Sequence, residues 1–228
     1  MESESLSPPS DTPFTIDRAD VGARLRHRRK ASGLTLKGLS QRSGVTLSMI
    51  SKAERGEVAL TYDKFAALAR ALGMDFRDLF GAQDAVASVA QLSLTRAGEH
   101  IVYRTGNYGY GMLAAELNDK RMVPMRATIS ARRIEDFADY VRHPGEEFVY
   151  LLAGELKICF EDGREALLRP GDSLYFHSAG GHLYLSTGPG DAEALVVCTE
   201  AIDPGQIQPS PETRSLPGNP RGRPISGP

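Results

Sequence analysis

The sequence predicts an α+β protein of two domains, an N-terminal bundle of five helices and a C-terminal β-barrel. Two observations support this fold class. Residues 17–80 contain short amphipathic segments that end at glycines, whereas residues 96–202 contain short segments rich in β-branched and aromatic residues and separated by turn residues. A chain of 228 residues is long enough to bury a hydrophobic core in each domain.

Each predicted helix of the first domain is bounded by a capping residue or by a glycine. The expected N-terminal caps are Asp20, Thr35, Thr46 and Asp75, and the glycines that end helices are Gly33, Gly44, Gly56 and Gly73. The fourth helix has one apolar stripe at helical spacing, formed by Phe65, Leu68, Ala69 and Leu72. Five short helices within residues 17–80 make a complete small bundle.

Three further segments flank or connect the two domains. Residues 1–16 form a predicted disordered arm, residues 81–95 a linker, and residues 203–228, which hold seven of the 14 prolines, a disordered tail. No apolar run approaches the roughly 20 residues that a membrane helix needs. Residues 1–15 lack the basic and apolar regions of a secretory signal, so we expect a cytoplasmic protein without a membrane partner.

The chain has two cysteines, Cys159 and Cys198, and each lies within an apolar run. A free thiol in such a run usually packs as a small hydrophobic side chain. We therefore predict two buried thiols, and the sequence assigns neither of them a function.

Basic residues are concentrated in the first domain. Between Asp20 and Arg55 there are nine basic residues and two acidic ones, so this stretch carries a formal charge of +7, while the whole chain carries −2. Such an asymmetry favours a polyanionic partner for the first domain. The alternative is a solvated basic helix face, and only the spacing of the other residues decides between the two.

The spacing in residues 35–56 is that of two helices joined by a tight turn. The segment reads TLKGLSQRSGVTLSMISKAERG, with the turn at SGV and the closing residues ERG. It resembles the helix-turn-helix of phage-repressor-like bacterial regulators, the XRE family. The resemblance implies a lambda-repressor-like bundle whose third helix reads a double-stranded DNA operator. It also implies that Glu54 pairs with Arg26 or Arg29 of the first helix.

The third predicted helix has an apolar face and a polar face. Ile50 and Ala53 face inward, and the opposite face carries short polar and basic side chains that can reach base edges in the major groove. Ser48, Ser51 and Lys52 are the predicted base-reading residues. The full predicted DNA-binding set is Gln41, Arg42, Thr46, Leu47, Ser48, Ser51, Lys52 and Arg55. The alternative is a helical module that binds another protein.

The second domain contains short predicted strands. They are MRATI (125–129), EFVYLL (147–152), LKICF (156–160), SLYF (173–176), HLYL (182–185) and ALVVCT (194–199). Asp162-Gly163 predicts a two-residue hairpin turn. The glycine-rich segment GNYGYG (106–111) is interpreted as a loop at the rim of the barrel.

Two motifs of the second domain resemble those of the cupins, which form a double-stranded β-helix barrel. The first is HPGEE (143–147), and the second is RPGDS (169–173) followed by His182. The resemblance implies that His143, Glu147 and His182 converge inside the barrel, where they could hold one divalent metal ion. Val141 stands where the family has a further histidine. The alternative is a metal-free pocket in which these residues bind an organic ligand or each other.

Further polar and aromatic residues on predicted strands are candidates for an effector site. Arg126, Tyr150, Tyr175 and Tyr184 would line the cavity if they face inward, because alternate strand positions face opposite sides of a sheet. Each can equally face solvent or pack in the core. Together with His143, Glu147 and His182 they form the predicted effector-binding set.

The two motifs together resemble transcriptional regulators in which an XRE-family helix-turn-helix is fused to a cupin sensor. The resemblance implies that a small-molecule effector in the barrel changes operator affinity. It also implies a homodimer on a two-half-site operator, because one such domain reads only a few base pairs. The alternative is a cupin-type metal-dependent enzyme, an isomerase or oxygenase, with an appended DNA-binding domain. The sequence contains no pairing of a nucleophile with a base, so we expect no catalytic residues.

Overall fold

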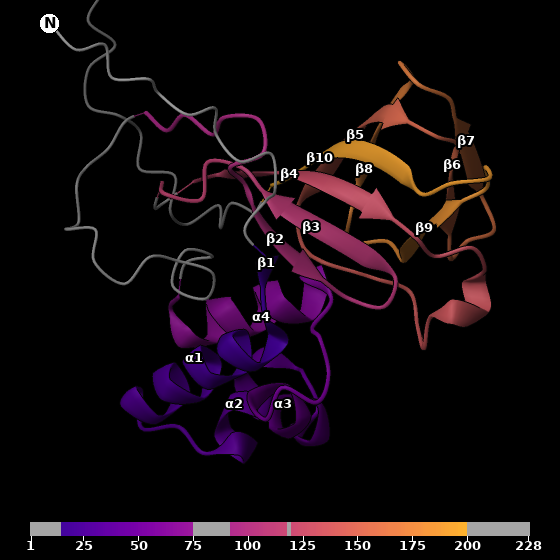
Figure 1. Cartoon of the computed structure of the whole chain (residues 1–228). Coiled ribbons are helices and arrows are strands. Elements are labelled where there is room, and N and C mark those ends of the chain that lie inside the picture. The colour runs from indigo at the N-terminus through magenta and orange to yellow at the C-terminus, as the bar shows by residue number, and fades with distance from the viewer. Residues whose placement is uncertain (1–14, 75–91, 118–119, 200–228) are drawn as a thin grey trace, which may run out of the picture.

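The computed structural model describes residues 15–74, 92–117 and 120–199. A helical domain lies at one end of the molecule and a β domain at the other, as Figure 1 shows. The described helices are α1 (Arg18–Ala31), α2 (Leu36–Ser43), α3 (Leu47–Glu54) and α4 (Tyr62–Leu72). The expected fifth helix, which would begin at Asp75, lies outside the described residues, as do the predicted disordered tail and most of the predicted linker.

The helix boundaries largely follow the predicted caps. Thr35 Oγ1 accepts a hydrogen bond from Gly38 N at 3.0 Å, and Thr46 Oγ1 accepts one from Met49 N at 3.3 Å. The first helix is different, because its N-cap is Asp17, whose carboxylate accepts a hydrogen bond from Ala19 N at 3.2 Å. The prediction of Asp20 as this cap is wrong. Asp20 lies in the first turn, where its charge is favourable beside the positive end of the helix dipole.

A buried ion pair links α1 to α3. The Arg29 guanidinium donates to both carboxylate oxygens of Glu54, at 2.6 and 2.9 Å, and to the Leu34 carbonyl oxygen at 2.8 Å. The arginine partner of Glu54 is therefore Arg29, one of the two expected from the resemblance. Around this pair the helices pack through fully buried apolar side chains, namely Leu25, Leu39, Ile50 and Leu68.

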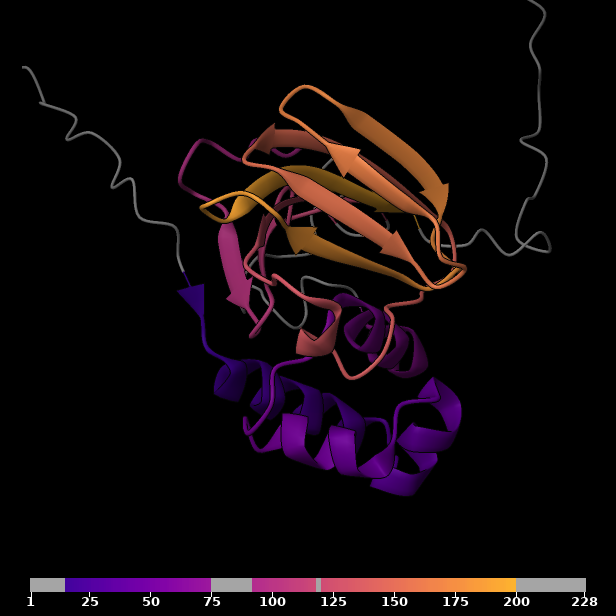
Figure 2. The ribbon, with the colours of Figure 1, turned by 90° about the vertical axis from the view of Figure 1, so that its right-hand side faces the viewer.

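The β domain consists of two sheets that face each other (Figure 2). The strands are β1 (Thr15–Ile16), β2 (Ile101–Arg104), β3 (Tyr108–Met112), β4 (Met122–Ile129), β5 (Glu146–Ala153), β6 (Leu156–Phe160), β7 (Glu165–Leu168), β8 (Ser173–His177), β9 (His182–Ser186) and β10 (Ala192–Thr199). The larger sheet has the order β1-β2-β3-β4-β10-β5-β8, and the smaller has the order β7-β6-β9. All six strands predicted by sequence segment are confirmed, and β6 and β7 form a hairpin around Asp162-Gly163. The loop is longer than the predicted two residues, because the Phe160 amide donates to the Arg164 carbonyl oxygen across residues 161–163.

The two sheets differ from the closed barrel that the sequence predicts. Among the described residues no strand pairing joins the edges of the larger sheet to those of the smaller. A single isolated bridge between Val141 and His182 links the segment before β5 to the smaller sheet. Side-chain hydrogen bonds also join the two facing sheets, since the Tyr108 hydroxyl on β3 bonds the Tyr184 backbone on β9 and the Tyr184 hydroxyl bonds Glu147 on β5.

The segment GNYGYG is not a loop, because residues 108–112 form β3 inside the larger sheet. Close packing requires a glycine at position 111. A Cβ atom on Gly111 would lie 2.5 Å from the His100 ring and 3.1 Å from the Arg126 carbonyl oxygen. The intervening Tyr108 and Tyr110 are buried, so the strand contributes aromatic side chains to the interior.

The helical and β domains are in direct contact. Thr15 and Ile16, which the sequence assigns to a disordered arm, form β1 and pair in parallel with β2. Leu60 N donates a hydrogen bond of 2.7 Å to the Tyr103 hydroxyl. One continuous cluster of buried apolar side chains runs from the helices into the sheets, and Figure 2 shows the helices lying directly beneath the β domain. None of the described helices combines the length and the apolar character needed to cross a membrane.

Candidate functional site

The candidate site is a small cavity between the two sheets. Its volume is about 40 Å³, and its walls are formed by β3, β4, β5, β9 and β10, by the segment before β5, and by the first residue of α4. The polar side chains in these walls are Tyr62, Tyr108, Tyr110, His143, Glu147, His182, Tyr184 and Cys198. The cavity therefore contains all three residues that the cupin resemblance predicts to converge.

Glu147 on β5 is at the centre of the polar group. Its Oε2 is 3.0 Å from His143 Nε2 and 3.3 Å from His182 Nε2, and its Oε1 accepts a hydrogen bond from the Tyr184 hydroxyl. All three predicted residues are at most 5% exposed. The predicted convergence of His143, Glu147 and His182 is thus present in the structure.

The buried carboxyl group of Glu147 is ionised. Burial alone would raise its pKa, but the hydrogen bonds from His143 and His182 outweigh burial and lower the pKa to about 2. His182 shows the matching effect. Burial lowers its pKa, yet the hydrogen bond to Glu147 gives a net increase. Its Nδ1 faces the Gly180 carbonyl oxygen at 2.9 Å, so both ring nitrogens of His182 face acceptors.

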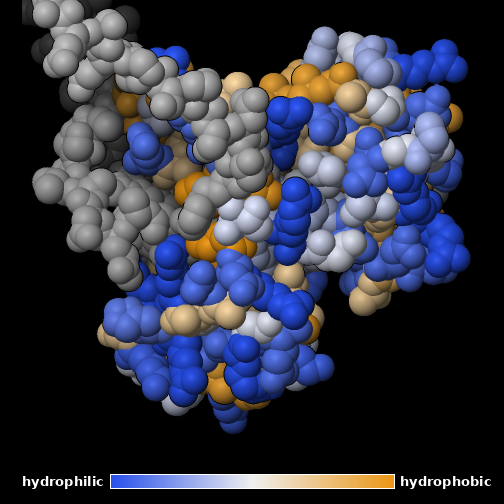
Figure 3. Space-filling view, in the orientation of Figure 1, coloured by the Kyte–Doolittle hydropathy of each residue, from blue (hydrophilic) through white to orange (hydrophobic). Residues whose placement is uncertain are grey.

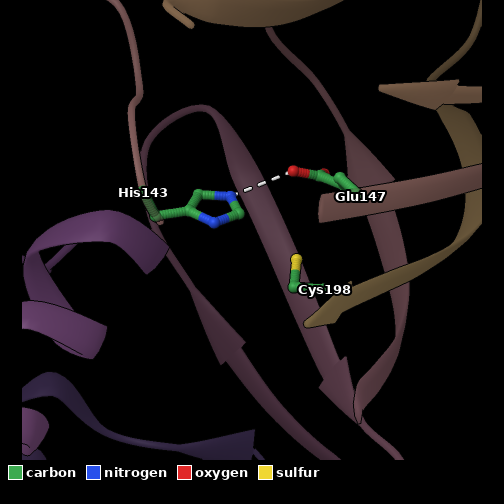
Figure 4. Close-up of side chains that lie close together, drawn as sticks. All are labelled: His143, Glu147 and Cys198. Carbon is green, nitrogen blue, oxygen red and sulfur yellow. Dashed lines mark hydrogen bonds and ion pairs between the residues drawn. The ribbon is translucent and has the colours of Figure 1, made fainter. Parts of the chain in front are cut away.

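Cys198 on β10 completes the group of donors. In the antiparallel register of β10 and β5, Cys198 lies opposite Glu147. One donor atom each from His143, Glu147 and Cys198 lie within 4.8 Å of one another, so the three could hold a metal ion. Figure 4 shows their side chains converging from the segment before β5, from β5 and from β10.

The thiol of Cys198 is free and buried, as the sequence predicts. Burial raises its pKa well above the usual range, and a hydrogen bond from Tyr62 opposes that effect. The sequence motifs assign this cysteine no role. The alternation along β10 could have predicted that Cys198 faces the interior, because Ala192, Ala194 and Val196 face inward with it.

Tyr62 is the contribution of the helical domain to the cavity. It is the first residue of α4, and its ring lies 4.9 Å from the His143 ring, measured between centroids, at an angle of 75°. The Tyr110 side chain forms a hydrogen bond with the backbone of Tyr62. Sequence analysis missed Tyr62, because nothing local in α4 indicates contact with the other domain.

Three residues of the predicted effector-binding set lie outside this cavity. Arg126, Tyr150 and Tyr175 are exposed on the outer face of the larger sheet, and Arg126 Nη2 pairs with Glu193 Oε2 at 2.5 Å. The prediction that these side chains line the cavity is wrong, because their inward-facing neighbours on β4 and β5 are Met125, Ala127, Glu147, Val149 and Leu151. Tyr184 does line the cavity, together with the unpredicted Tyr108 and Tyr110.

The predicted DNA-binding residues of the helical domain lie on α2, on α3 and at the two caps of α3. Gln41, Arg42, Thr46, Leu47, Ser48, Lys52 and Arg55 are exposed, and Ser51 is half-buried. Figure 3 shows that hydrophilic residues cover most of this domain's visible surface. Four of the side chains have partners within the chain. The Arg55 guanidinium donates to Glu57 at 2.5 and 3.0 Å and also to the Ser51 hydroxyl, and the Thr46 and Ser48 hydroxyls are 3.3 Å apart.

Comparison with known proteins agrees with this architecture. A family model described as a helix-turn-helix domain matches residues 20–80, and one described as a cupin domain matches residues 135–198. No curated protein matches the chain.

Among solved structures, an HTH_3 family transcriptional regulator from Vibrio cholerae is 18% identical and has a TM-score of 0.55. The match covers 81% of this chain and 97% of the regulator. Hydroxypropylphosphonic acid epoxidase from S. wedmorenis is 22% identical over 80% of this chain and 98% of its own, with a TM-score of 0.43. At these identities the likeness concerns the fold alone. By the two family matches, the chain joins an XRE-like helix-turn-helix domain to a cupin domain.

Proposed function

We propose that the chain is a transcriptional regulator that binds an operator through α3 and senses a small ligand in its cupin domain. The observation that carries this proposal is the position of Tyr62. This residue begins a helix of the DNA-binding domain and also forms part of the wall of the cupin cavity. A ligand in the cavity therefore contacts, or displaces, a side chain that is covalently part of the DNA-binding domain.

The mechanism is a thermodynamic coupling between the two sites. Helix α4 packs against α2, and α2 packs against α3. A ligand that binds one position of Tyr62 more tightly than another shifts the population of α4 positions, and with it the arrangement of the helix-turn-helix. The ligand can change operator affinity only by the ratio of its affinities for these arrangements.

On the DNA side, α3 has the composition of a helix that reads the major groove. The exposed Ser48 is short enough, and the exposed Lys52 flexible enough, to reach base edges. Leu47 is 46% exposed, which suits contact with a thymine methyl group. Gln41, Arg42 and Arg55 flank the helix and would contact phosphates. We further propose a homodimer on an operator of two half-sites, because one recognition helix reads too few base pairs for useful specificity.

The residues of the cavity fit a divalent metal ion. Two imidazoles and one carboxylate are a donor set that transition metals accept, and here they already share one carboxylate oxygen as a common neighbour. A bound ion would supply Lewis acidity and would hold these side chains in a single arrangement. His143, Glu147 and His182 are the residues of this set that would bind it.

The same three donors make a cupin-type metal-dependent enzyme the second candidate function. The size of the cavity decides between the two candidates. A volume of about 40 Å³ is far below the roughly 300–1,000 Å³ of typical pockets for organic ligands. The cavity suits an occupant of atomic size that acts as a signal better than an organic substrate, and we therefore favour the sensor.

The experiment that tests the proposed function is selection of binding sites from random DNA with the full chain. We expect a consensus of two half-sites. Ser48→Ala and Lys52→Ala should broaden this consensus and weaken operator binding by about 1–3 kcal/mol for each lost base contact. Lys157→Ala, a lysine on β6 in the β domain, is the matched control and should bind as the unaltered chain does. Binding should also fall steeply as salt increases, because counterions are released from the phosphates. Failure to enrich any sequence, or a flat response to salt, would contradict the proposal.

A further inference from the structure

We infer that the signal sensed in the cavity is a transition-metal ion that binds Cys198 as a thiolate, together with His143, Glu147 and His182. This inference rests on the proposed function and names the class of ligand for that site. Neither the helix-turn-helix nor the cupin resemblance assigns a role to Cys198. Four features of the cavity support the inference, namely its volume, the positions of its donor atoms, their chemistry and the contact with Tyr62.

The size of the cavity limits its occupant. A volume of about 40 Å³ exceeds the roughly 10–15 Å³ that a cavity needs to hold one water molecule. An ion with a few bound waters fits this space. Besides the candidate donors, the wall consists of four apolar residues and of Tyr62, Tyr108, Tyr110 and Tyr184. The tyrosine hydroxyls already have hydrogen-bond partners within the protein, so a polar organic ligand would have to displace those bonds.

The donor atoms have the separations that a single ion requires. An ion about 2.0–2.3 Å from each nitrogen, oxygen or sulfur ligand places those ligands at most roughly 4.6 Å apart. The candidate donor atoms of His143, Glu147 and Cys198 lie within 4.8 Å of one another, which small side-chain adjustments reduce to that range. His182 Nε2 is 3.3 Å from the carboxylate of Glu147 but lies outside this group of three donor atoms, so its side chain must move to become a fourth ligand.

Cys198 supplies a metal-binding donor atom in place of the one that is absent at Val141. Valine has no donor atom, so the segment before β5 contributes only His143, and the cysteine supplies its sulfur from β10 on another wall of the cavity. A thiolate changes the metals that the site prefers. Sulfur and imidazole ligands together favour ions such as Zn²⁺, Fe²⁺ and Co²⁺ over Mg²⁺ and Ca²⁺, which prefer oxygen ligands.

The thiol also connects the site to the DNA-binding domain. Tyr62 is hydrogen-bonded to Cys198 and packs against His143, so it contacts two of the four proposed ligands. On binding, the Cys198 proton and any proton on the ring nitrogens that bind the ion are released to solvent, and the sulfur and nitrogen lone pairs bind the metal. Both contacts of Tyr62 therefore change when the ion binds, and α4 begins at Tyr62.

The test is titration of the purified, chelator-treated full chain with Co²⁺, followed by absorption spectroscopy. A cobalt–thiolate bond gives a charge-transfer band in the near ultraviolet, and we expect this band to saturate at one ion per chain and to disappear when Zn²⁺ is added. Cys198→Ser should lose the band. Its affinity for Co²⁺ should fall by more than roughly 10- to 100-fold, which is the loss expected when a group that only contacts a metal ligand is removed. Cys159→Ser, the other buried cysteine, should keep both the band and the affinity.

Circular dichroism of Cys198→Ser, and its operator binding without metal, show whether the variant is folded. The absence of a charge-transfer band in the unaltered chain, or an unchanged band in a folded Cys198→Ser variant, would overturn the assignment of Cys198. Operator affinity that is the same with and without saturating Zn²⁺ would overturn the metal as the signal. These results are separate from failure of the proposed function, because the absorption measurement requires no DNA.

Discussion

The helical domain and the β domain each bury one carboxylate beside cationic or hydrogen-bonding partners, but the partners differ. Glu54 is paired with one guanidinium, at 2.6 and 2.9 Å, and among the residues that the structure describes it belongs to no group of potential metal ligands. Glu147 is surrounded by two imidazoles, a phenol and a nearby thiol, at the edge of a cavity.

The partners of Glu54 and Glu147 differ in whether they can give up a proton and bind a metal ion. A guanidinium stays protonated and has no free lone pair, so Arg29 can only hold Glu54 in place. Imidazole and thiol groups can give up a proton and bind a metal through the lone pair that remains. The first pair therefore fixes the position of α3 relative to α1, and the second group can change its arrangement when a ligand arrives.

The largest effect on stability is expected in the helical domain. Glu54→Ala leaves the Arg29 guanidinium buried without its carboxylate partner, and removing one member of a buried pair costs about 3–5 kcal/mol of unfolding free energy. Chemical denaturation of the full chain, followed by helix content, would measure this loss. Glu57→Ala is the control, since the Glu57 pair with Arg55 is exposed and should contribute little. A Glu54→Ala variant as stable as the Glu57→Ala variant would show that the buried pair does not hold the domain together.

A different outcome is expected for the carboxylate of the β domain. Glu147→Gln preserves the shape of the side chain and should cost only about 1–3 kcal/mol of unfolding free energy, since some hydrogen-bonding groups around it lose their partner. It should nevertheless abolish metal binding, as measured by metal analysis after dialysis. Tyr150→Phe lies on the same strand with its side chain outward, and it should retain the metal. Retention of metal by Glu147→Gln would mean that the ion, if any, binds elsewhere.

The smallest effect on stability, with the most specific effect on function, is expected for Tyr62→Phe. This change removes the hydroxyl that is hydrogen-bonded to Cys198 and keeps the ring that packs on His143. The stability cost should be about 0.5–1.5 kcal/mol, the usual net contribution of one hydrogen bond. Operator affinity without metal should be nearly unchanged, whereas its response to Zn²⁺ should be reduced. A full response in Tyr62→Phe would assign the coupling to the aromatic ring or to another contact.

Much of the fold and half of the site could be predicted from the sequence. Capping residues and glycines are local signals, so the helix-turn-helix was located by Thr35, Gly44 and Thr46. The cupin motifs located His143, Glu147 and His182, because the spacing of a motif is also local. These predictions are confirmed in the structure by the boundaries of α2 and α3 and by the convergence around Glu147.

The wrong or missing predictions from the sequence have physical causes. On β5 both faces are apolar, so alternation could not tell that Val149 faces inward and Tyr150 outward. Glycine is unfavourable in strands, so the glycines of β3 favour the prediction of a loop. In the structure Gly111 instead allows the His100 ring to approach the strand closely. Tyr62 could not be found because its role arises only when α4 packs against another domain.

The central claim is that the metal site of the cupin domain and the operator site of the helical domain are coupled through Tyr62. Thermodynamic linkage makes such coupling reciprocal. The most direct measurement is therefore the affinity of the full chain for Zn²⁺, determined by competition with a chelator, in the presence and absence of saturating operator DNA. We predict that the operator changes the Zn²⁺ affinity by the same factor by which Zn²⁺ changes the operator affinity, and that Tyr62→Phe reduces both factors equally. A Zn²⁺ affinity that is the same with and without operator would contradict the account.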